Sequence, residues 1–168
     1  RRGVFMMKRV LIIGGSRFLG PAVIEGLLER GDKVTIFNRG NSYGQDTPKG
    51  VETIEGDRTK LAELQKLKGR NFDYVYDMCC YDKDDADKLL EVVDPKAHLI
   101  FLSTAAVYER PSIYPITETS SLGEWESFGT YGTNKAEAEA AFTRFSKQHN
   151  SKLTIFRPTY LLGEDNYF

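Results

Sequence analysis

The sequence has few of the residues that build disulfide-bonded, metal-binding or membrane proteins. Its two cysteines are adjacent, Cys79 and Cys80, and its two histidines are far apart. Adjacent cysteines strain any disulfide between them and cannot form a metal site alone, so we expect no metal and a reducing, cytoplasmic compartment. The apolar run near the start reaches glycine after four residues. That run is too short for a signal peptide or a membrane span, so we expect no membrane partner.

A charge excess of either sign is also missing. The 168 residues hold 23 Lys and Arg against 24 Asp and Glu, a net charge of -1. A nucleic-acid-binding chain usually has a basic surplus and a platform of paired aromatic residues, and neither is present here. The length favours a single domain. We interpret residues 1–6 as an upstream or expression-derived tail and residues 7–168 as one dinucleotide-binding domain.

Apolar runs alternate along the chain with segments of helical periodicity. The predicted strands are 10–13, 33–37, 51–55, 72–78, 98–104 and a sixth that begins at 153, and the predicted helices are 18–30, 59–69, 84–93 and 131–148. Thr59 is the expected cap of the second helix. Strands that alternate with helices in this way form right-handed crossovers and a parallel sheet. The predicted fold is therefore α/β, a doubly wound parallel sheet of the Rossmann type.

A glycine-rich loop follows the first strand and opens the first helix. It reads "GGSRFLG" and consists of Gly14, Gly15, Ser16, Arg17, Phe18, Leu19 and Gly20. Glycines let the backbone approach a pyrophosphate, and the helix start offers unpaired N–H groups and the positive end of a dipole. The loop predicts a dinucleotide site, with a large cation at its centre.

The end of the second strand indicates which dinucleotide is bound. NAD-preferring sites place a carboxylate there to accept from the ribose 2′-OH, whereas this chain has Asn38 followed by Arg39. A guanidinium can grip a 2′-phosphate with charge-assisted hydrogen bonds. We therefore expect NADP in preference to NAD, with Arg17 and Arg39 together at the adenosine phosphate.

Hydroxyl and amine side chains follow later elements of the predicted sheet. The fifth strand ends in Ser103 and Thr104, and the next helix begins "YGTNK", with Tyr131 and Lys135 four residues apart. That spacing places the phenol and the ammonium on one helical face. A nearby ammonium stabilises tyrosinate, so the pair predicts a general acid/base with a lowered phenol pKa.

Together these motifs resemble the extended short-chain dehydrogenase/reductase superfamily, in particular its NAD-dependent epimerase/dehydratase family. The stretches that carry the resemblance are the glycine loop with Arg17 in place of its middle glycine, "EGDRT", "FLSTAAVYE", "YGTNK" and "FRPTYLLG". The resemblance implies a catalytic set of Thr104, Tyr131 and Lys135. At the adenine end of the cofactor, the resemblance implies a contact of Asp57 with the amino group, with Arg58 beside it. At the nicotinamide end, it implies that Pro158 lies near the ring and that Lys135 holds the ribose.

The implied reaction is hydride transfer between nicotinamide and a carbon of a nucleotide-sugar-like substrate, with Tyr131 exchanging the proton. Dehydratases of the family carry an Asp-Glu pair after the catalytic threonine, and this chain has Ala105 and Ala106 there. Epimerisation or reduction is therefore favoured over dehydration. The family's smaller carboxy-terminal substrate domain has no counterpart in these 168 residues, so we expect an incomplete catalytic pocket and an exposed apolar seam. Either a homodimer or poor solubility would follow from such a seam.

Two other functions stay open on the same fold. The loop "GGSRFLG" also resembles the "GGTRFLG" loop of chloroplast stem-loop-binding proteins, which implies an RNA- or nucleotide-binding protein. A regulator that senses the dinucleotide without chemistry is the other alternative. Such a regulator has no need of Thr104, Tyr131 and Lys135, and the near-neutral charge does not favour RNA.

Overall fold

The computed structural model describes residues 6–40, 47–110 and 114–162. Most of the predicted tail and the last glycine of "FRPTYLLG", Gly163, lie outside these residues. The strands are β1 (Arg9–Ile13), β2 (Lys33–Asn38), β3 (Glu52–Glu55), β4 (Tyr74–Asp77), β5 (His98–Leu102) and β6 (Leu153–Phe156). The helices are α1 (Leu19–Glu29), α2 (Leu61–Leu64), α3 (Lys83–Leu90) and α4 (Thr130–His149), with 3-10 turns η1 (Gln65–Leu67), η2 (Ala105–Val107) and η3 (Glu126–Phe128).

The six strands form one sheet in the order β3-β2-β1-β4-β5-β6, and every neighbouring pair is parallel. The strand order reverses between β1 and β4. In an open parallel sheet, the crevice at such a reversal, outside the carboxyl ends of the strands, is where ligands bind. The predicted doubly wound α/β sheet is confirmed, and its topology directs attention to the ends of β1 and β4.

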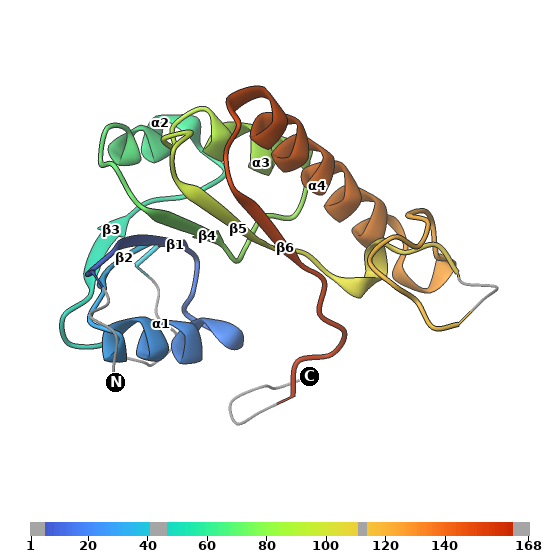
Figure 1. Ribbon diagram of the computed structural model, residues 1–168, viewed down its shortest axis with the longest axis horizontal. Helices are drawn as coiled ribbons and strands as arrows, with labels where there is room; N and C mark the ends of the chain where they lie inside the picture. Colours follow the sequence, from blue (N-terminus) through green and yellow to red (C-terminus); the bar gives the residue numbers. More distant parts are fainter. Residues whose placement is uncertain (1–5, 41–46, 111–113, 163–168) are drawn as a thin grey trace.

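Helices cover both faces of the sheet (Figure 1): α1 lies on one face, and α2, α3 and α4 lie on the other. The strand β1 is buried on both sides because its side chains alternate between the two layers. Val10 and Ile12 pack with Ile24 and Leu27 of α1. Residues 11 and 13 of β1 instead belong to the core beneath the other three helices.

The second crossover differs from the prediction. The expected helix 59–69 is only one turn, α2, followed by η1, and its N-cap is Lys60 instead of Thr59. The predicted cap is wrong because both the amide and the hydroxyl of Thr59 donate to Asp57 Oδ1, at 2.9 and 2.8 Å. Leu64 and Leu67 are nevertheless buried as their spacing predicts.

The last helix, α4, has the length that its alanine, glutamate and lysine content predicts. Its buried face packs on the sheet, where Phe142 stacks on Phe101 with ring centroids 4.7 Å apart. Asn150 ends the helix in the left-handed conformation. Within the described residues, no helix combines the length and apolarity required to cross a membrane.

Candidate functional site

The carboxyl ends of β1 and β4 meet at the reversal of strand order. The amide of Met78 donates to Ile13 O at 3.1 Å, and the amide of Gly14 donates to Phe37 O at 2.9 Å. A β-carbon added at Gly14 would lie 3.0 Å from Cys79 Sγ. The glycine loop therefore begins against the end of β4, where the topology predicts a ligand.

The conformation of the loop explains which glycines it requires. Gly14 and Gly15 have φ of 88° and 82°, a region that favours glycine. A β-carbon at Gly20 would lie 2.2 Å from Gly15 O, so α1 begins in close contact with the loop backbone. Among the described residues, the non-glycine residues with positive φ include Phe18 but not Arg17. Arg17 therefore occupies a position whose backbone does not need glycine.

Asn38 links the end of β2 to this loop. Its amide nitrogen donates to Ser16 Oγ at 3.0 Å, and its side-chain oxygen accepts from the Gly40 amide at 2.9 Å. The next residue, Arg39, is exposed. Hydrogen bonds from Thr59 lower the pKa of the Asp57 carboxyl, and the charge of Arg39 lowers it further. The structure thus gathers Ser16, Asn38, Arg39 and Asp57 at one corner of the carboxyl edge.

The second predicted group forms where α4 begins. Thr104 follows β5, and its hydroxyl accepts from the Ala106 amide at 3.2 Å, which caps η2. A β-carbon at Gly132 would lie 2.0 Å from Ala106 O, so the first turn of α4 presses directly on η2. This contact brings Tyr131 to Thr104 and leaves Tyr131 43% exposed.

The electrostatics of Tyr131 differ from the prediction. Burial raises the pKa of the phenol, and hydrogen bonding with Thr104 only partly opposes it. The expected lowering by Lys135 is wrong for this structure because the ammonium is turned to the sheet. Lys135 Nζ donates to Cys80 O at 2.8 Å and to Leu102 O at 2.6 Å, beneath the helix and 4% exposed. Burial lowers the pKa of Lys135 itself.

The segment after β6 is tied to the same edge. Pro158 O accepts from the Ala105 amide at 2.8 Å, which places Pro158 beside the loop of Thr104. Arg157, which we did not predict as a site residue, makes a two-pronged ion pair with the buried Glu139 at 3.0 and 2.7 Å and donates to Tyr108 Oη at 2.9 Å. The pair anchors this segment to α4. The "RP" dipeptide is the only sequence signal for it.

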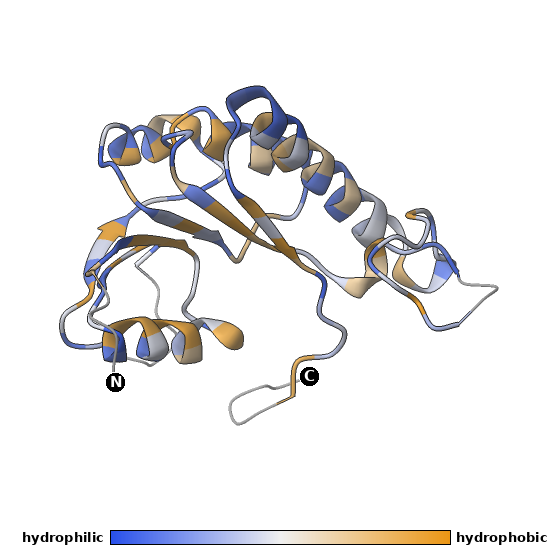
Figure 2. Cartoon of the chain, viewed as in Figure 1, coloured by the Kyte–Doolittle hydropathy of each residue, from blue (hydrophilic) through white to orange (hydrophobic). Residues whose placement is uncertain are grey.

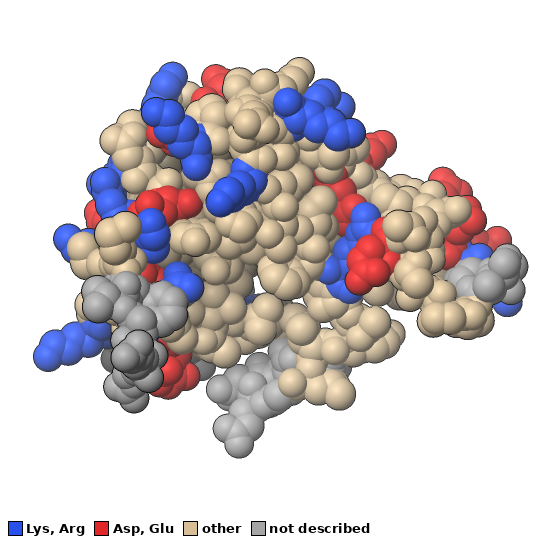
Figure 3. Space-filling view, viewed as in Figure 1, with Lys and Arg blue, Asp and Glu red and all other residues tan. Residues whose placement is uncertain are grey.

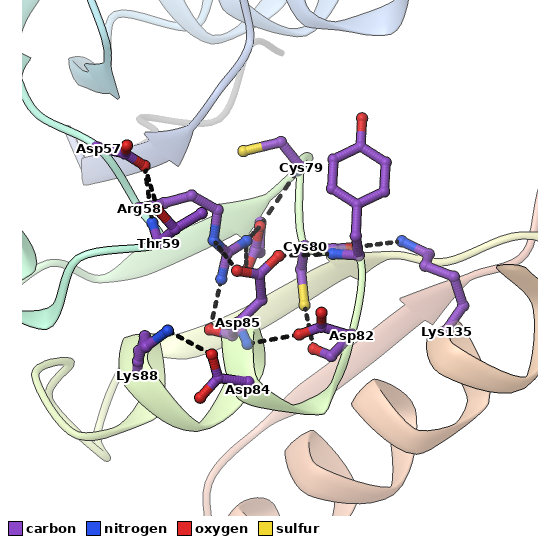
Figure 4. Close-up of polar contacts among 12 residues, drawn as sticks. Asp57, Arg58, Thr59, Cys79, Cys80, Asp82, Asp84, Asp85, Lys88 and Lys135 are labelled. Atoms are coloured by element: carbon purple, nitrogen blue, oxygen red, sulfur yellow. Dashed lines mark hydrogen bonds and ion pairs between the residues drawn. The ribbon is translucent and has the colours of Figure 1, made fainter. Parts of the chain in front are cut away.

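Arg58 occupies a different place from the one the prediction implies. Its side chain is buried and donates to both carboxylate oxygens of Asp77 and to the main-chain oxygen of Asp85 (Figure 4). Burial disfavours the charge of Arg58, but Asp77 and Asp85 outweigh it and hold the pKa above its ordinary value. The Arg58 guanidinium therefore binds acceptors in the protein interior.

No metal centre accompanies these groups in the parts of the chain that the structure describes, where His, Cys, Asp and Glu side chains form no suitable cluster of three. Cys79 is partly buried and Cys80 is buried, and neither is in a disulfide. Burial raises the pKa of Cys79 to about 12. Both thiols are therefore protonated at neutral pH, as expected of small packing residues.

Comparison with known sequences identifies the family. A model of the NAD dependent epimerase/dehydratase family matches residues 10–167. The chain belongs to this family. Its relatives include a UDP-glucose 4-epimerase from Corynebacterium glutamicum, 28% identical over 89% of this chain and 50% of the relative. The chloroplast stem-loop binding protein of 41 kDa b from Arabidopsis thaliana is also 28% identical, over 95% of this chain and 44% of the relative.

Solved structures of the family show the same fold. The UDP-glucose 4-epimerase of Thermus thermophilus, solved with NAD, has a TM-score of 0.73 and 23% identity over 89% of this chain and 54% of its own. A dTDP-glucose 4,6-dehydratase from Bacillus anthracis, also with NAD, has a TM-score of 0.78 and 19% identity over 96% of this chain and 57% of its own. The chain spans about half the length of the curated relatives it matches.

Proposed function

We propose that this chain is the dinucleotide-binding half of an epimerase or reductase that acts on a nucleotide-sugar-like substrate. The observation that carries the proposal is that two groups lie along one carboxyl edge of the sheet. One is the glycine loop with Asn38, and the other is the set of Thr104, Tyr131 and Lys135. A purely binding protein has no need of the second group. The UDP-sugar epimerases among the relatives support the choice of substrate class.

The loop fits a dinucleotide because its glycines hold the main chain in a compact cradle at the start of α1. β-Carbons at Gly14 or Gly20 would collide with Cys79 Sγ or the Gly15 backbone, so only glycine allows this close packing. The unpaired N–H groups at the start of a helix and its dipole favour a pyrophosphate there. The residues that would hold the cofactor are those from Gly14 to Gly20, Asn38, Arg39, Asp57, the backbone at Arg58, and Pro158, whereas the Lys135 ammonium is held by main-chain oxygens beneath α4. The nicotinamide dinucleotide, when bound, supplies the acceptor or donor of hydride.

The protein's own groups then handle the proton and the substrate oxygen. Tyr131, exposed at the start of α4, exchanges a proton with the substrate hydroxyl through its phenol. The Thr104 hydroxyl lies within hydrogen-bonding reach of that phenol and orients the same oxygen. Lys135 places a buried positive charge between the ends of β4 and β5, where it favours negative charge that develops above it.

We further propose that the chain selects NADP over NAD through Arg39, although the family is described as NAD-dependent. Asn38 and Arg39 stand at the end of β2, where an NAD-preferring site places a carboxylate, and Arg39 is exposed beside the Asn38 corner. Titration of the chain with NADPH and NADH, followed by cofactor fluorescence, tests the site. We expect Arg39→Ala to weaken NADPH about tenfold or more, because a charge-assisted pair with the 2′-phosphate is lost, and to leave NADH unchanged.

The matched control is Arg70→Ala, which removes a partly exposed arginine that pairs with Glu52 at the opposite end of β3. It should bind both cofactors as the unmodified chain does. Binding of neither dinucleotide by folded protein would overturn the cofactor proposal. Tighter binding of NADH than NADPH would overturn only the assignment of Arg39.

A stem-loop RNA is the competing ligand, because one relative is named for that activity. On the face shown in Figure 3, cationic and anionic side chains are intermixed and form no patch of one sign. RNA binding depends on phosphate contacts, which require clustered positive charge. Addition of a stem-loop RNA during the titration separates the two functions, since RNA affinity without dinucleotide affinity would favour the alternative.

A further inference from the structure

Three charged residues from separate segments, Arg58, Asp77 and Asp85, meet beneath the turn that follows β4. Figure 4 labels Arg58 and Asp85. Arg58 comes from the loop after β3, Asp77 ends β4, and Asp85 lies in the first turn of α3. Their exposed fractions are 8%, 1% and 6%. Arg58 Nη1 lies 2.8 and 3.0 Å from the two Asp77 oxygens, Nη2 lies 2.6 Å from Asp85 O, and Nε lies 3.5 Å from Asp85 Oδ1. We call these three residues the Arg58 cluster.

Each carboxylate of the Arg58 cluster also holds a main-chain amide of the turn. Asp77 Oδ1 accepts from the Cys79 amide at 3.2 Å, and Asp85 Oδ2 accepts from the Tyr81 amide at 3.0 Å. The 78–79 and 80–81 peptide groups are therefore fixed by carboxylates that Arg58 holds in place, and the second of these groups contains the Cys80 carbonyl. The position of the Cys80 carbonyl follows from both.

That carbonyl accepts a hydrogen bond from the Lys135 ammonium at 2.8 Å, and Leu102 O at the end of β5 accepts another. Lys135 crosses from α4 to the turn, and Figure 4 shows its side chain directed at Cys80. We infer that the Arg58 cluster is a positioning device for Lys135, which acts through the main chain of residues 79–81. The inference rests on the proposed function, because that function gives Lys135 its role.

The charges of the group support this role. Arg58 and Lys135 contribute two positive charges, and Asp77 and Asp85 contribute two negative ones, so the buried set balances. Removing Arg58 leaves two buried carboxylates facing a single ammonium, and a buried charge without its partner is strongly unfavourable. Lys135 is then drawn from the Cys80 carbonyl toward Asp77, while the amides of Cys79 and Tyr81 lose the fixed orientation of their acceptors.

Nuclear magnetic resonance of the cofactor-free chain tests the inference. The readouts are the Lys135 ammonium signal, assigned with Lys135→Arg, and the hydrogen-exchange rates of the Cys79 and Tyr81 amides. We expect Arg58→Gln to shift or abolish the ammonium signal and to accelerate both amides about tenfold or more, because local opening becomes easier. The control is Arg30→Gln, which removes another arginine paired with a buried aspartate, Asp32, but at the end of α1.

A second variant, Arg58→Lys, keeps the positive charge but cannot contact Asp77 and the Asp85 main chain through two separate nitrogens. It should shift the same signals in the same direction by a smaller amount. If Arg58→Gln does not fold, Arg58→Lys decides the question. The inference is overturned if the folded variant leaves the Lys135 signal and both amides as they are in the unmodified chain. Because these readouts need no dinucleotide, failure of the chain to bind NADPH or NADH would reject the proposed function separately.

Discussion

At the scale of single residues, the glycine loop shows how one irregular position can be accommodated. Arg17 stands where the resembled pattern has glycine, yet the positive φ angles of the loop fall on Gly14, Gly15 and Phe18. Phe18, with φ of 53° and a side chain that is 58% exposed, carries a conformation that non-glycine residues seldom adopt. The arginine therefore adds a charge to the loop at a position whose backbone does not require glycine.

The ionisation of Tyr131 gives a test at the same scale. Because burial raises its pKa above the ordinary value of 10.0, Tyr131 should be fully protonated at neutral pH and act first as a proton donor. Ultraviolet titration of the chain minus that of Tyr131→Phe yields the curve of this tyrosine alone. We expect a midpoint above 10, and a still higher midpoint in Thr104→Val, since hydrogen bonding with Thr104 lowers the pKa. A midpoint below 10 would contradict this expectation and support the lowered phenol pKa that the Tyr131–Lys135 spacing predicts.

At the scale of elements, the junction of the glycine loop with α1 depends on close backbone contact. We expect Gly20→Ala to destabilise the chain by about 1–3 kcal/mol or more, because its new methyl group would meet the Gly15 backbone. Gly26→Ala lies in the same helix, where an added β-carbon has nothing within 4 Å. That control should stabilise the chain by about 0.5–1 kcal/mol through helix propensity.

Urea unfolding measures both variants, and NADPH titration shows whether the loss at Gly20 extends to the cofactor site. Equal stability of Gly20→Ala and the unmodified chain would mean that the loop can move away from α1 without cost. The cradle would then not be a fixed feature of the fold.

The elements that the sequence predicts best are those whose pattern is long or continuous. The run from Val10 to Ile13 and the alanine-rich helix α4 both occur where expected, because burial on two faces and high helix propensity are local signals. The Arg58 cluster is not local. Arg58 is 19 residues from Asp77 and 27 from Asp85 along the chain, and only the folded sheet brings them together. The direction of Lys135 was unpredictable for the same reason.

At the scale of the whole molecule, the parallel sheet has one apolar core on each of its faces. The larger core lies between the sheet and the helices α2, α3 and α4, and the smaller core lies under α1. Beyond β6, the described chain ends in hydrophobic residues (Figure 2), where Leu162 is 84% exposed and Tyr160 is 76% exposed. Phe156 on β6 is 55% exposed. Three large hydrophobic side chains are therefore exposed on β6 and on the segment that follows it.

The stability of the whole fold should fall in acid in two stages. Burial lowers the pKa of His98 below its ordinary 6.5, and the charge of Lys152 lowers it further. Just below pH 6.5, the unfolded chain is therefore protonated at His98 to a greater extent than the folded chain. Stability is then complete above pH 6.5 and declines as the pH falls below it. The second stage begins near pH 4.5, because hydrogen bonds lower the pKa of carboxyl groups that must be protonated on unfolding, namely Glu52, Asp57, Glu63 and Asp73.

Urea unfolding between pH 8 and 4 separates these stages when the chain is compared with His98→Gln. A glutamine at this position can still reach Thr154 Oγ1, which lies 2.8 Å from His98 Nε2, but it does not titrate. The variant should lose the decline that begins at pH 6.5 and keep the one that begins near 4.5. Since His149 is present in both proteins, the difference isolates His98. The same slope in both proteins between pH 6.5 and 4.5 would contradict the first stage and leave the carboxylates as the sole source of acid sensitivity among these groups.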